Sequence, residues 1–235
     1  MSANARDVAI VVPAFNEGRV IGDMLASLLG LAAGHAIVVV DDGSTDDTAA
    51  VAARYPVHLL THACNLGAGA ATHTGMQYAI DTLGARFIVT VDSDGQHRAD
   101  DIEQLLAPLR AGTHDVVLGT RFSPEVIDAT RREMPLAKRL LLRCAIAFTR
   151  LTTGLQLTDT NIGLRAFTRA ALRSMTLEQN RMAHCSEVEQ EIARKRLRWC
   201  EIPVIVHYTS YSVRKGQGVW NSIDIVWELL TLRMR

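Results

Sequence analysis

The chain has few cysteines and no long hydrophobic run. Its four cysteines, Cys64, Cys144, Cys185 and Cys200, are scattered without the paired spacing of a zinc site or a disulfide framework, so we expect free thiols. No uninterrupted apolar run approaches the roughly 20 residues needed to cross a bilayer, and the N-terminal residues lack the apolar region of a signal peptide. We therefore expect a cytoplasmic protein.

Aromatic residues make up only 5% of the 235 residues, and the formal net charge is zero. The basic residues are not interleaved with stacking aromatics and no nucleic-acid-binding motif is present, which argues against a nucleic-acid partner. The charge is nevertheless divided unevenly. Residues 1–130 carry 7 Lys/Arg and 16 Asp/Glu, a net of −9, whereas residues 131–235 carry 18 and 9, a net of +9. Such asymmetry predicts different partners for the two halves.

Two phosphate-binding motifs are also missing. Gly67-Ala68-Gly69 begins like a dinucleotide-binding fingerprint, but the next glycine is Gly75 and the stretch does not follow the first predicted strand. That strand is followed by residues 13–17, which do not form the Gly-rich, Lys/Arg-containing triphosphate loop expected of a nucleotidyltransferase. We interpret the glycine pair as a tight turn that opens a helix over residues 70–83.

What the sequence does contain is a repeated pattern of short apolar runs separated by helical stretches. The runs predict strands over residues 8–12, 36–40, 87–91 and 115–118. Helices are predicted over residues 20–29 and 48–54, the second with Thr45 and Asp46 as caps. Strand, helix and strand in alternation predict an α/β fold with a parallel sheet. With 48% hydrophobic residues, the chain can bury one large core, and we expect a single domain over residues 1–235.

Acidic residues follow two of these strands. Asp92-Ser93-Asp94 comes directly after residues 87–91, and Asp41 and Asp42 come after residues 36–40. Two carboxylates one residue apart at the carboxyl end of a strand can hold one divalent cation, and an oxygen site suits Mg²⁺ or Mn²⁺ bound together with substrate phosphates. The sequence therefore predicts a metal-dependent nucleotide-diphosphate site at this edge of the sheet.

Three ordered motifs resemble those of the GT-A glycosyltransferases of family 2. They read VVPAFNE at residues 11–17, VDDGSTD at residues 40–46 and DSDGQH at residues 92–97. The resemblance extends through residues 65–70, 119–122 and 159–167, an order similar to that of the polyprenyl-phosphate branch containing dolichol-phosphate mannose synthase. It spans about residues 8–218, although residues 208–217 follow the usual Arg/Gly/Ser/Lys pattern of that branch only loosely.

The resemblance implies a GT-A fold, in which a mostly parallel nucleotide-binding sheet is flanked by helices and followed by an acceptor-side extension. The nucleotide-sugar and metal-binding part would occupy about residues 1–120, and the acceptor-side, membrane-facing part about residues 121–235. The acidic first part suits a metal-bound nucleotide sugar, and the basic second part suits an anionic acceptor or an anionic membrane surface.

The resemblance also implies roles on the donor side. Asp92 and Asp94 would be the metal ligands, and the metal would neutralise the leaving diphosphate. Gln96 would orient the leaving group or the acceptor, and His97 would either assist the metal or act as a hydrogen-bond partner. The nucleotide would be bound by a set of residues from all three motifs: Pro13, Phe15, Glu17, Asp41, Asp42 and Asp92.

On the acceptor side, Arg121 follows the strand predicted at residues 115–118, and its guanidinium suits bidentate phosphate binding. By resemblance, Arg121 would bind the acceptor phosphate. Asp159 and Arg165 would shape the site around the sugar and the acceptor, and Asp159 would be the base if the acceptor were a hydroxyl. The remaining cations assigned to acceptor binding are Arg131, Arg132, Arg139, Arg214 and Lys215.

Two segments bear on membrane contact. Residues 135–151 place Leu136, Leu140, Cys144, Ala147 and Leu151 on one helical face and arginines on another. A second apolar stripe recurs between residues 220 and 234. Each can either pack against the domain or dock on a membrane. We interpret the stretch containing Glu187, Glu189 and Glu191 as mainly a solvated helix, with Glu187 as a possible site residue.

The function that fits these observations is inverting transfer of a sugar from a nucleotide-diphosphate sugar to polyprenyl phosphate at the cytoplasmic membrane face. An alternative acceptor is a hydroxyl of a glycan, lipid or small molecule. Alternatives of a different class are a nucleotidyltransferase and a catalytically silent binding module. A membrane-protein partner and a homo-oligomer both remain open.

Overall fold

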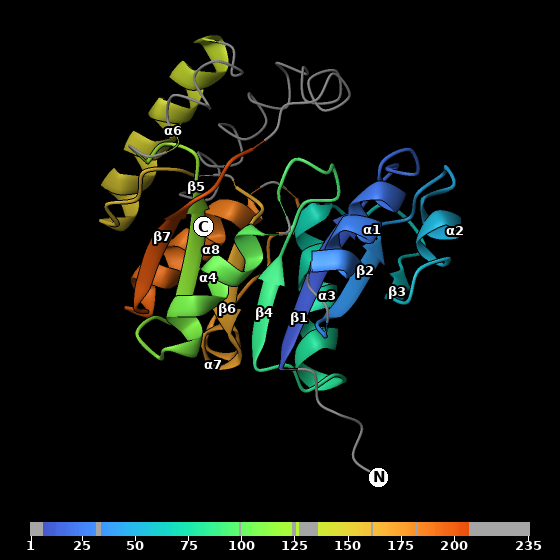
Figure 1. Cartoon of the computed structure of the whole chain (residues 1–235). Helices are drawn as coiled ribbons and strands as arrows, with labels where there is room; N and C mark the ends of the chain where they lie inside the picture. The colour runs from blue at the N-terminus through green and yellow to red at the C-terminus, as the bar shows by residue number, and fades with distance from the viewer. Residues whose placement is uncertain are drawn as a thin grey trace.

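The structure is a computed structural model that describes residues 7–31, 34–98, 100–123, 126, 136–160, 162–181 and 183–206. Helices cover both faces of one sheet (Figure 1). The strands are β1 (Val8–Ala14), β2 (Ala36–Asp41), β3 (His58–Thr61), β4 (Phe87–Thr90), β5 (Val116–Thr120), β6 (Arg165–Thr168) and β7 (Trp199–Pro203). The helices are α1 (Ile21–Leu31), α2 (Thr48–Ala52), α3 (Ala68–Asp81), α4 (Asp101–Arg110), α6 (Leu136–Thr153), α7 (Arg169–Ser174) and α8 (His184–Arg194).

The seven strands lie in the order β3-β2-β1-β4-β6-β5-β7. All neighbouring pairs are parallel except those made by β6, which runs antiparallel to β4 and β5. The chain builds β2 and β3 on one side of β1 and then returns to place β4 on the other side. The strand order therefore reverses between β1 and β4, and in open α/β sheets ligands bind beyond the carboxyl ends of the strands at such a point.

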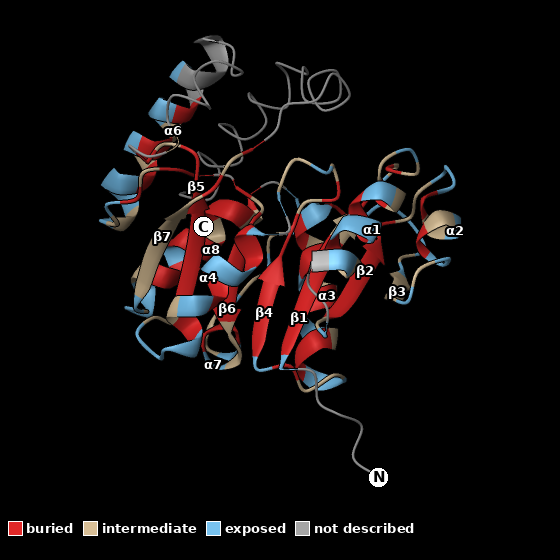
Figure 2. Cartoon of the chain, in the orientation of Figure 1, coloured by how far each residue is buried: buried red, intermediate tan, exposed pale blue. Residues whose placement is uncertain are grey.

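The central strands are buried on both faces, which explains their uninterrupted apolar sequences (Figure 2). In β1, Val8, Ile10 and Val12 belong to the core beneath α1 and α4. Ala9 and Val11, on the opposite face, belong to the core beneath α3, α7 and α8. The alternation follows from the two-residue period of a strand, and it fixes which face each helix covers.

The elements predicted from the sequence are confirmed with small changes in their bounds. Helix α3 begins two residues earlier than expected, and α2 ends at Ala52. The predicted cap of α2 needs correction, because Asp47 is the N-cap residue and its side chain makes no capping bond. Asp46 instead accepts a hydrogen bond from the backbone N–H of Thr48 at 3.0 Å. The four cysteines are free, as expected.

Helix α6 extends beyond the sheet on the side of β5 and β7 (Figure 1). Leu142 and Ile146 are buried toward the domain, whereas the side chains of Leu140 and Leu151 are exposed, with 66% and 86% of their surface accessible. In the ranges that the structure describes, no helix is long and apolar enough to cross a membrane.

Candidate active site

The carboxyl ends of β1, β2 and β4 bring the three acidic motifs together at the reversal point of the sheet. Pro13, at the end of β1, and Asp92, after β4, line the same hollow. The negative charge of Glu17, from the loop after β1, acts on Asp94. The structure therefore groups the donor-side residues that the sequence places on separate strands.

The loops after β1 and β2 are held together by hydrogen bonds between them. The backbone N–H of Asn16 donates to the hydroxyl of Ser44 at 2.9 Å, and the N–H of Thr45 donates back to the Asn16 side-chain oxygen at 2.9 Å. The N–H of Glu17 donates to the hydroxyl of Thr48 at 2.8 Å. These bonds fix the first two motifs as one unit before any ligand binds.

The side chains of Phe15 and Glu17, both in the first motif, differ in their exposure to solvent. Phe15 is 37% exposed, which leaves its ring accessible, whereas Glu17 is only 5% exposed. Large exposed hydrophobic side chains are informative when they border a polar crevice. The position of Phe15 is suited to covering a flat ligand such as a nucleobase.

Asp41 and Asp42 are both buried, but their partners differ. The Asp42 carboxylate accepts the backbone N–H groups of Leu66 and Gly67, at 3.0 and 2.7 Å, and it contacts Nδ1 of His62 at 2.7 Å. Asp41 accepts one long backbone hydrogen bond within its own turn, at 3.3 Å. The Asp42 carboxylate is thus occupied by contacts that hold residues 62–67 in place. Asp41 makes fewer contacts of this kind and is therefore the better candidate for binding a nucleoside.

Asp92 lines the hollow with Pro13, and Asp94 lies close enough for the charge of Asp92 to act on it. The side chain of Asp92 is 49% exposed, and its Oδ2 lies 3.8 Å from Nε2 of His97, whose side chain is almost fully covered. Asp94 accepts the backbone N–H of Gln96 at 3.0 Å. The motif therefore forms a turn in which Gln96 lies beside Asp94 and His97 lies beside Asp92.

The pKa values of Asp92 and Asp94 are shifted in opposite directions. Burial raises the pKa of Asp94 to about 6, and the negative charges of Asp92 and Glu17 add to the rise. The carboxyl group of Asp92 is half exposed but partly desolvated, which acts to raise its pKa; the neighbouring His97, His184 and Arg165 outweigh this, so the pKa of Asp92 is lowered. At neutral pH the crevice therefore holds two close negative charges, an arrangement that a bound cation would relieve.

Gly163, in the loop before β6, lies directly against Asp92. The hydroxyl of Thr90 donates to the Gly163 carbonyl at 2.7 Å, which holds the loop close to β4. A Cβ atom at residue 163 would lie 2.1–2.2 Å from the Asp92 carboxylate atoms. Only glycine leaves room for Asp92 in this position, because real Cβ atoms do not approach other atoms so closely.

Arg121 and Asp159 form a buried ion pair at the end of β5. The Asp159 carboxylate receives Nε of Arg121 at 2.7 Å and Nη2 at 2.8 Å. It also accepts the backbone N–H groups of Arg121, at 2.9 Å, and of Thr160, at 2.7 Å. Each carboxylate oxygen thus accepts two N–H groups. Bidentate pairs of this kind fix the plane of the guanidinium.

Arg165 is also buried, and it lies between Asp92 and Glu189, since its charge acts on the pKa of both. Its Nε donates to the Ile162 carbonyl at 2.8 Å, and Nη1 donates to the Cys185 carbonyl at 3.4 Å. It lines the same hollow as Asp92 and lowers the pKa of Asp92. The sequence assigned Arg165 to the acceptor, and that assignment stays a prediction; in the structure its charge also reaches Asp92.

The sequence profile of glycosyl transferase family 2 matches residues 9–180. This chain belongs to glycosyl transferase family 2. The chain is 31% identical, over 97% of its own length and 96% of the relative's, to a UDP-N-acetylglucosamine–dolichyl-phosphate N-acetylglucosaminyltransferase of Methanococcus voltae. It is 27% identical, over 77% of its length and 69% of the relative's, to a polyprenol monophosphomannose synthase of Mycolicibacterium smegmatis.

Solved structures show the same fold. Glucosyl-3-phosphoglycerate synthase of Mycobacterium tuberculosis, crystallised with phosphoglyceric acid, has a TM-score of 0.70 and 19% identity to this family 2 transferase. The match covers 96% of this chain and 79% of that one. Another crystal structure of that synthase contains Mn²⁺ and uridine diphosphate. The GT-A prediction is confirmed, and the relatives that are polyprenyl-phosphate sugar transferases support a glycosyltransferase role.

Several residues of the predicted acceptor site lie outside the described side chains. Arg139 belongs to α6, and its side chain lies outside the described part of the structure. Four further cations predicted to bind the acceptor lie outside the described residues: Arg131, Arg132, Arg214 and Lys215. The apolar stripe between residues 220 and 234 also lies outside them.

The prediction that the acidic stretch of α8 is mainly solvated is wrong for two of its three glutamates. Glu189 and Glu191 are buried, with 1% and 6% of their surface exposed. Glu187 is half-buried and accepts two backbone N–H groups of residues 178 and 179. The three- and four-residue spacing of Cys185, Val188 and Ile192 was the available signal, because it defines an apolar face next to Glu189.

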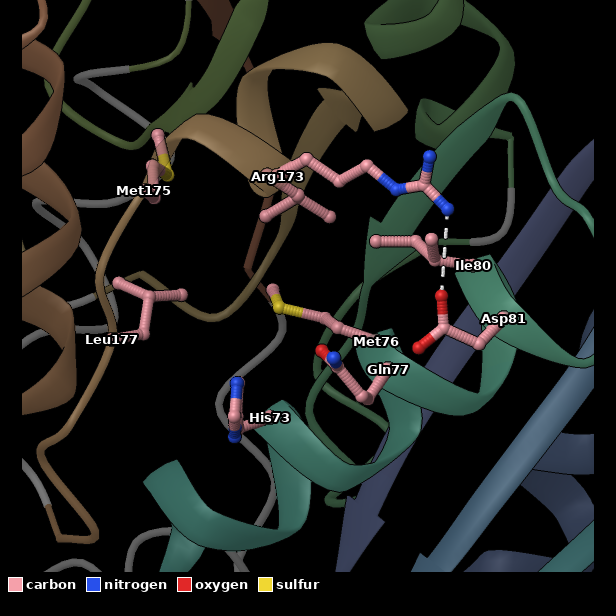
Figure 3. A pocket seen from close by; sticks show the side chains of 9 residues that line it. His73, Met76, Gln77, Ile80, Asp81, Arg173, Met175 and Leu177 are labelled. Carbon is pink, nitrogen blue, oxygen red and sulfur yellow. Dashed lines mark hydrogen bonds and ion pairs between the residues drawn. The ribbon is translucent and has the colours of Figure 1, made fainter.

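A larger hollow of about 230 Å³ lies between α3 and α7, away from the acidic motifs of this family 2 transferase (Figure 3). Its apolar wall includes Met76, Leu172 and Met175, and Arg173 and Asp81 face one another across its rim at 3.5 Å. Met76 also lines the hollow at Asp92. No residue of the three acidic motifs contributes to it.

Proposed function

We propose that this protein transfers a sugar from a nucleotide-diphosphate sugar to polyprenyl phosphate by one direct displacement that inverts the anomeric centre. The observation that carries the proposal is the grouping of Asp92, Asp94 and Glu17 at the reversal point of the sheet, with Asp41 at the carboxyl end of the neighbouring strand β2. The chain also aligns over almost its whole length with a dolichyl-phosphate sugar transferase. The proposed location is the cytoplasmic face of a membrane.

A divalent cation fits the carboxylates of the DSDGQH motif at residues 92–97. Asp92 and Asp94 supply oxygen ligands, and the pKa of Asp94, raised by burial and by Asp92, reflects negative charge that a cation would neutralise. Among the described residues, no group of three or more His, Cys, Asp or Glu side chains is arranged to hold a metal. Two carboxylates with open positions suit Mg²⁺ or Mn²⁺ bound together with phosphates. When bound, the cation would supply Lewis-acid stabilisation of the leaving diphosphate.

The chain's own residues would bind and orient the donor. Phe15 would cover the base, with Pro13 in the wall behind it, while Glu17 and Asp41 would accept hydrogen bonds from the nucleoside. Asp42 would contribute by fixing the neighbouring loop through its contacts at residues 62–67. Gln96, held beside Asp94 by its backbone N–H, would orient the leaving group.

On the acceptor side, the bonding of Asp159 favours a phosphate over a hydroxyl. A phosphate acceptor is already ionised and needs no base, whereas a hydroxyl acceptor would need one. Asp159, the candidate base, is fully buried and accepts four N–H groups, so it is poorly placed to take a proton. Arg121 would bind the acceptor phosphate with its guanidinium plane fixed by Asp159. Further positive charge would come from Arg165 and from the cations that lie outside the described side chains.

Helix α6 supports a peripheral membrane contact. The apolar stripe predicted to pack against the domain or dock on a membrane faces outward, since Leu140, Cys144 and Leu151 are all exposed. Arg143 and Arg150 are exposed on the same helix. An apolar stripe flanked by arginines matches a surface helix that binds anionic lipid. Flotation with anionic vesicles should therefore be weakened by a Leu140→Ser/Leu151→Ser variant and by added salt.

The donor half of the proposal is tested by titrating uridine, guanosine and thymidine diphosphate sugars into the protein with and without Mn²⁺. One nucleoside class should bind, and only with the cation. If none of the nucleotide sugars binds, the proposed sugar transfer from a nucleotide-diphosphate sugar is wrong.

The acceptor half is tested by turnover with polyprenyl phosphate, with a soluble alcohol and with neither. Product should form only with polyprenyl phosphate. Transfer to the alcohol alone would retain the transferase assignment and overturn the lipid-phosphate acceptor.

A further inference from the structure

Glu189 is a buried carboxyl group that none of the proposed steps uses. It lies in the second turn of α8, is 1% exposed, and its Oε1 accepts the hydroxyl of Thr160 at 2.7 Å. Its Oε2 is buried and makes no hydrogen bond of normal geometry with the residues that the structure describes, although the Thr149 hydroxyl on α6 lies close enough to lower the pKa of Glu189. An unsatisfied buried carboxylate oxygen is costly, and a proton on that oxygen lowers the cost.

The groups that face Glu189 come from three neighbouring elements. Arg165 faces it from β6 and Asp159 from the loop before β6, while α6 contributes the uncharged Thr149. Burial raises the pKa of Glu189 to about 7; Arg165 opposes this rise and Asp159 adds to it. Both the acid and the ionised forms are therefore populated near neutral pH.

Thr160 connects this carboxyl group to the proposed acceptor site. Its carbonyl accepts Nη2 of Arg121 at 3.0 Å, and its N–H donates to Asp159 at 2.7 Å. Its hydroxyl donates to Glu189. Three hydrogen bonds in different directions leave Thr160 little freedom, so a change at Glu189 reaches Arg121 through one intervening residue.

We propose that Glu189 is a positioning residue for the acceptor site, and that its acid form supports the binding of an anionic acceptor. The inference rests on the proposed function, because it assumes that Arg121 meets an acceptor phosphate. Ionised Glu189 would place a second negative charge beside Asp159 and compete for Arg165, which weakens the positive field of the site. The acid form keeps the bond to Thr160 without adding this charge.

The experiment compares the KM values for polyprenyl phosphate and for the nucleotide sugar from about pH 6 to about pH 8.5 in wild type, Glu189→Gln and Glu191→Gln. Glutamine keeps an acceptor for Thr160 and cannot ionise. Glu191 is the matched control, since it is buried on the same helix but accepts from Thr176 and Arg194, away from Thr160. If only the acid form binds, about one-tenth of the protein is competent at pH 8, so the wild-type acceptor KM should rise roughly tenfold.

The expected result is that Glu189→Gln removes this rise and leaves the donor KM unchanged, whereas Glu191→Gln follows wild type. Ionisation of the lipid phosphate itself affects all three proteins equally. Wild-type pH dependence in Glu189→Gln, or an equal change in donor and acceptor KM, would overturn the role of Glu189. If wild type does not use polyprenyl phosphate at all, the proposed function and this inference both fail.

If Glu189→Gln does not fold, Thr160→Val provides a second test of the proposal. Thr160→Val removes the hydroxyl that donates to Glu189 while preserving the size of the side chain. It should raise the acceptor KM at every pH, with the donor KM unchanged. An acceptor KM equal to that of wild type would contradict the connection between Glu189 and Arg121.

Discussion

Arg121 and Asp159 hold one another in a bidentate ion pair with contacts of 2.7 and 2.8 Å, and both side chains are almost fully buried. The sequence assigned these residues to rival acceptors, Arg121 to a phosphate and Asp159 to a hydroxyl. The pair makes them one structural unit, because a change in either side chain removes the main partner of the other. Loss of activity in Arg121→Lys alone therefore does not distinguish the two acceptors.

The coupling of this pair can be measured through stability. Arg121→Met and Asp159→Asn should each lower the free energy of unfolding by about 3–5 kcal/mol, since each leaves a buried partner without its counter-charge. The double variant should lose much less than the sum of the two. Urea denaturation measures all three, and Asp81→Asn, which breaks the exposed 3.5 Å contact with Arg173, is the control expected to change little. Additive losses would show that the pair is not coupled.

Asp94→Asn should remove most of the transferase activity without unfolding the protein. The substitution weakens a proposed metal ligand at the end of a strand and leaves the core intact. Loss of about 2 kcal/mol or more of transition-state stabilisation corresponds to roughly a thirtyfold or larger fall in rate. Steady-state kinetics measures the activity, and circular dichroism measures whether the variant is folded. Asp100→Asn is the control, because Asp100 is an exposed acidic residue after the motif. Near-normal turnover in folded Asp94→Asn would exclude the metal assignment, and Asp92→Asn should act in the same direction.

Gly163→Ala tests whether the position of Asp92 depends on the loop before β6. The added methyl would overlap the Asp92 carboxylate, so we expect Asp92 to move and metal-dependent donor binding to weaken by tenfold or more, about 1.4 kcal/mol. Gly30→Ala is a matched control, because Gly30 lies within α1 and a Cβ there would meet nothing within 4 Å. Calorimetry with Mn²⁺ and the nucleotide sugar provides the measurement. Unchanged affinity in Gly163→Ala would contradict the close packing of these two residues.

The donor half of the site could be predicted because its residues follow directly after strands. Buried parallel strands give apolar runs, and their carboxyl ends meet at one edge, so the sequence alone predicts that Glu17, Asp41 and Asp92 lie at the same edge. The acceptor half could not be predicted in the same way. Arg121 and Asp159 are 38 residues apart, and no local pattern marks their contact. The burial of Glu189 depends on the packing of α8 against β6 and α6, which the sequence indicates only through the apolar spacing of its neighbours.

The affinity for the divalent cation should depend on pH through Asp94. Without a cation the pKa of Asp94 is about 6, because burial and the charge of Asp92 favour its acid form. Metal binding must displace this proton, so Mn²⁺ affinity should be constant above about pH 7 and fall about tenfold per pH unit below pH 6. Titration of Mn²⁺ followed by electron paramagnetic resonance measures the affinity. A flat profile down to pH 5 would show that Asp94 is not a ligand.

Glu189 should make the stability of the protein depend on pH. Because the folded-state pKa of Glu189, about 7, exceeds its ordinary value of 4.5, the folded protein retains a proton that the unfolded chain releases between these pH values. The wild type should therefore lose stability relative to Glu189→Gln as pH rises from about 4.5 to about 7, by roughly 3 kcal/mol, and the difference should stay constant above that.

Glu191 provides a contrast within the same helix. Arg194 holds the pKa of Glu191 below its ordinary value, with further help from the N–H of Thr176, so ionised Glu191 stabilises the folded protein at neutral pH and this contribution is lost as pH falls. Glu191→Gln should thus be less stable than wild type at pH 7, with the gap closing in acid. Urea denaturation from about pH 4 to about pH 8.5 measures both variants. If the two stability differences change with pH in the same direction, then Glu189 does not carry a proton that the folded protein retains.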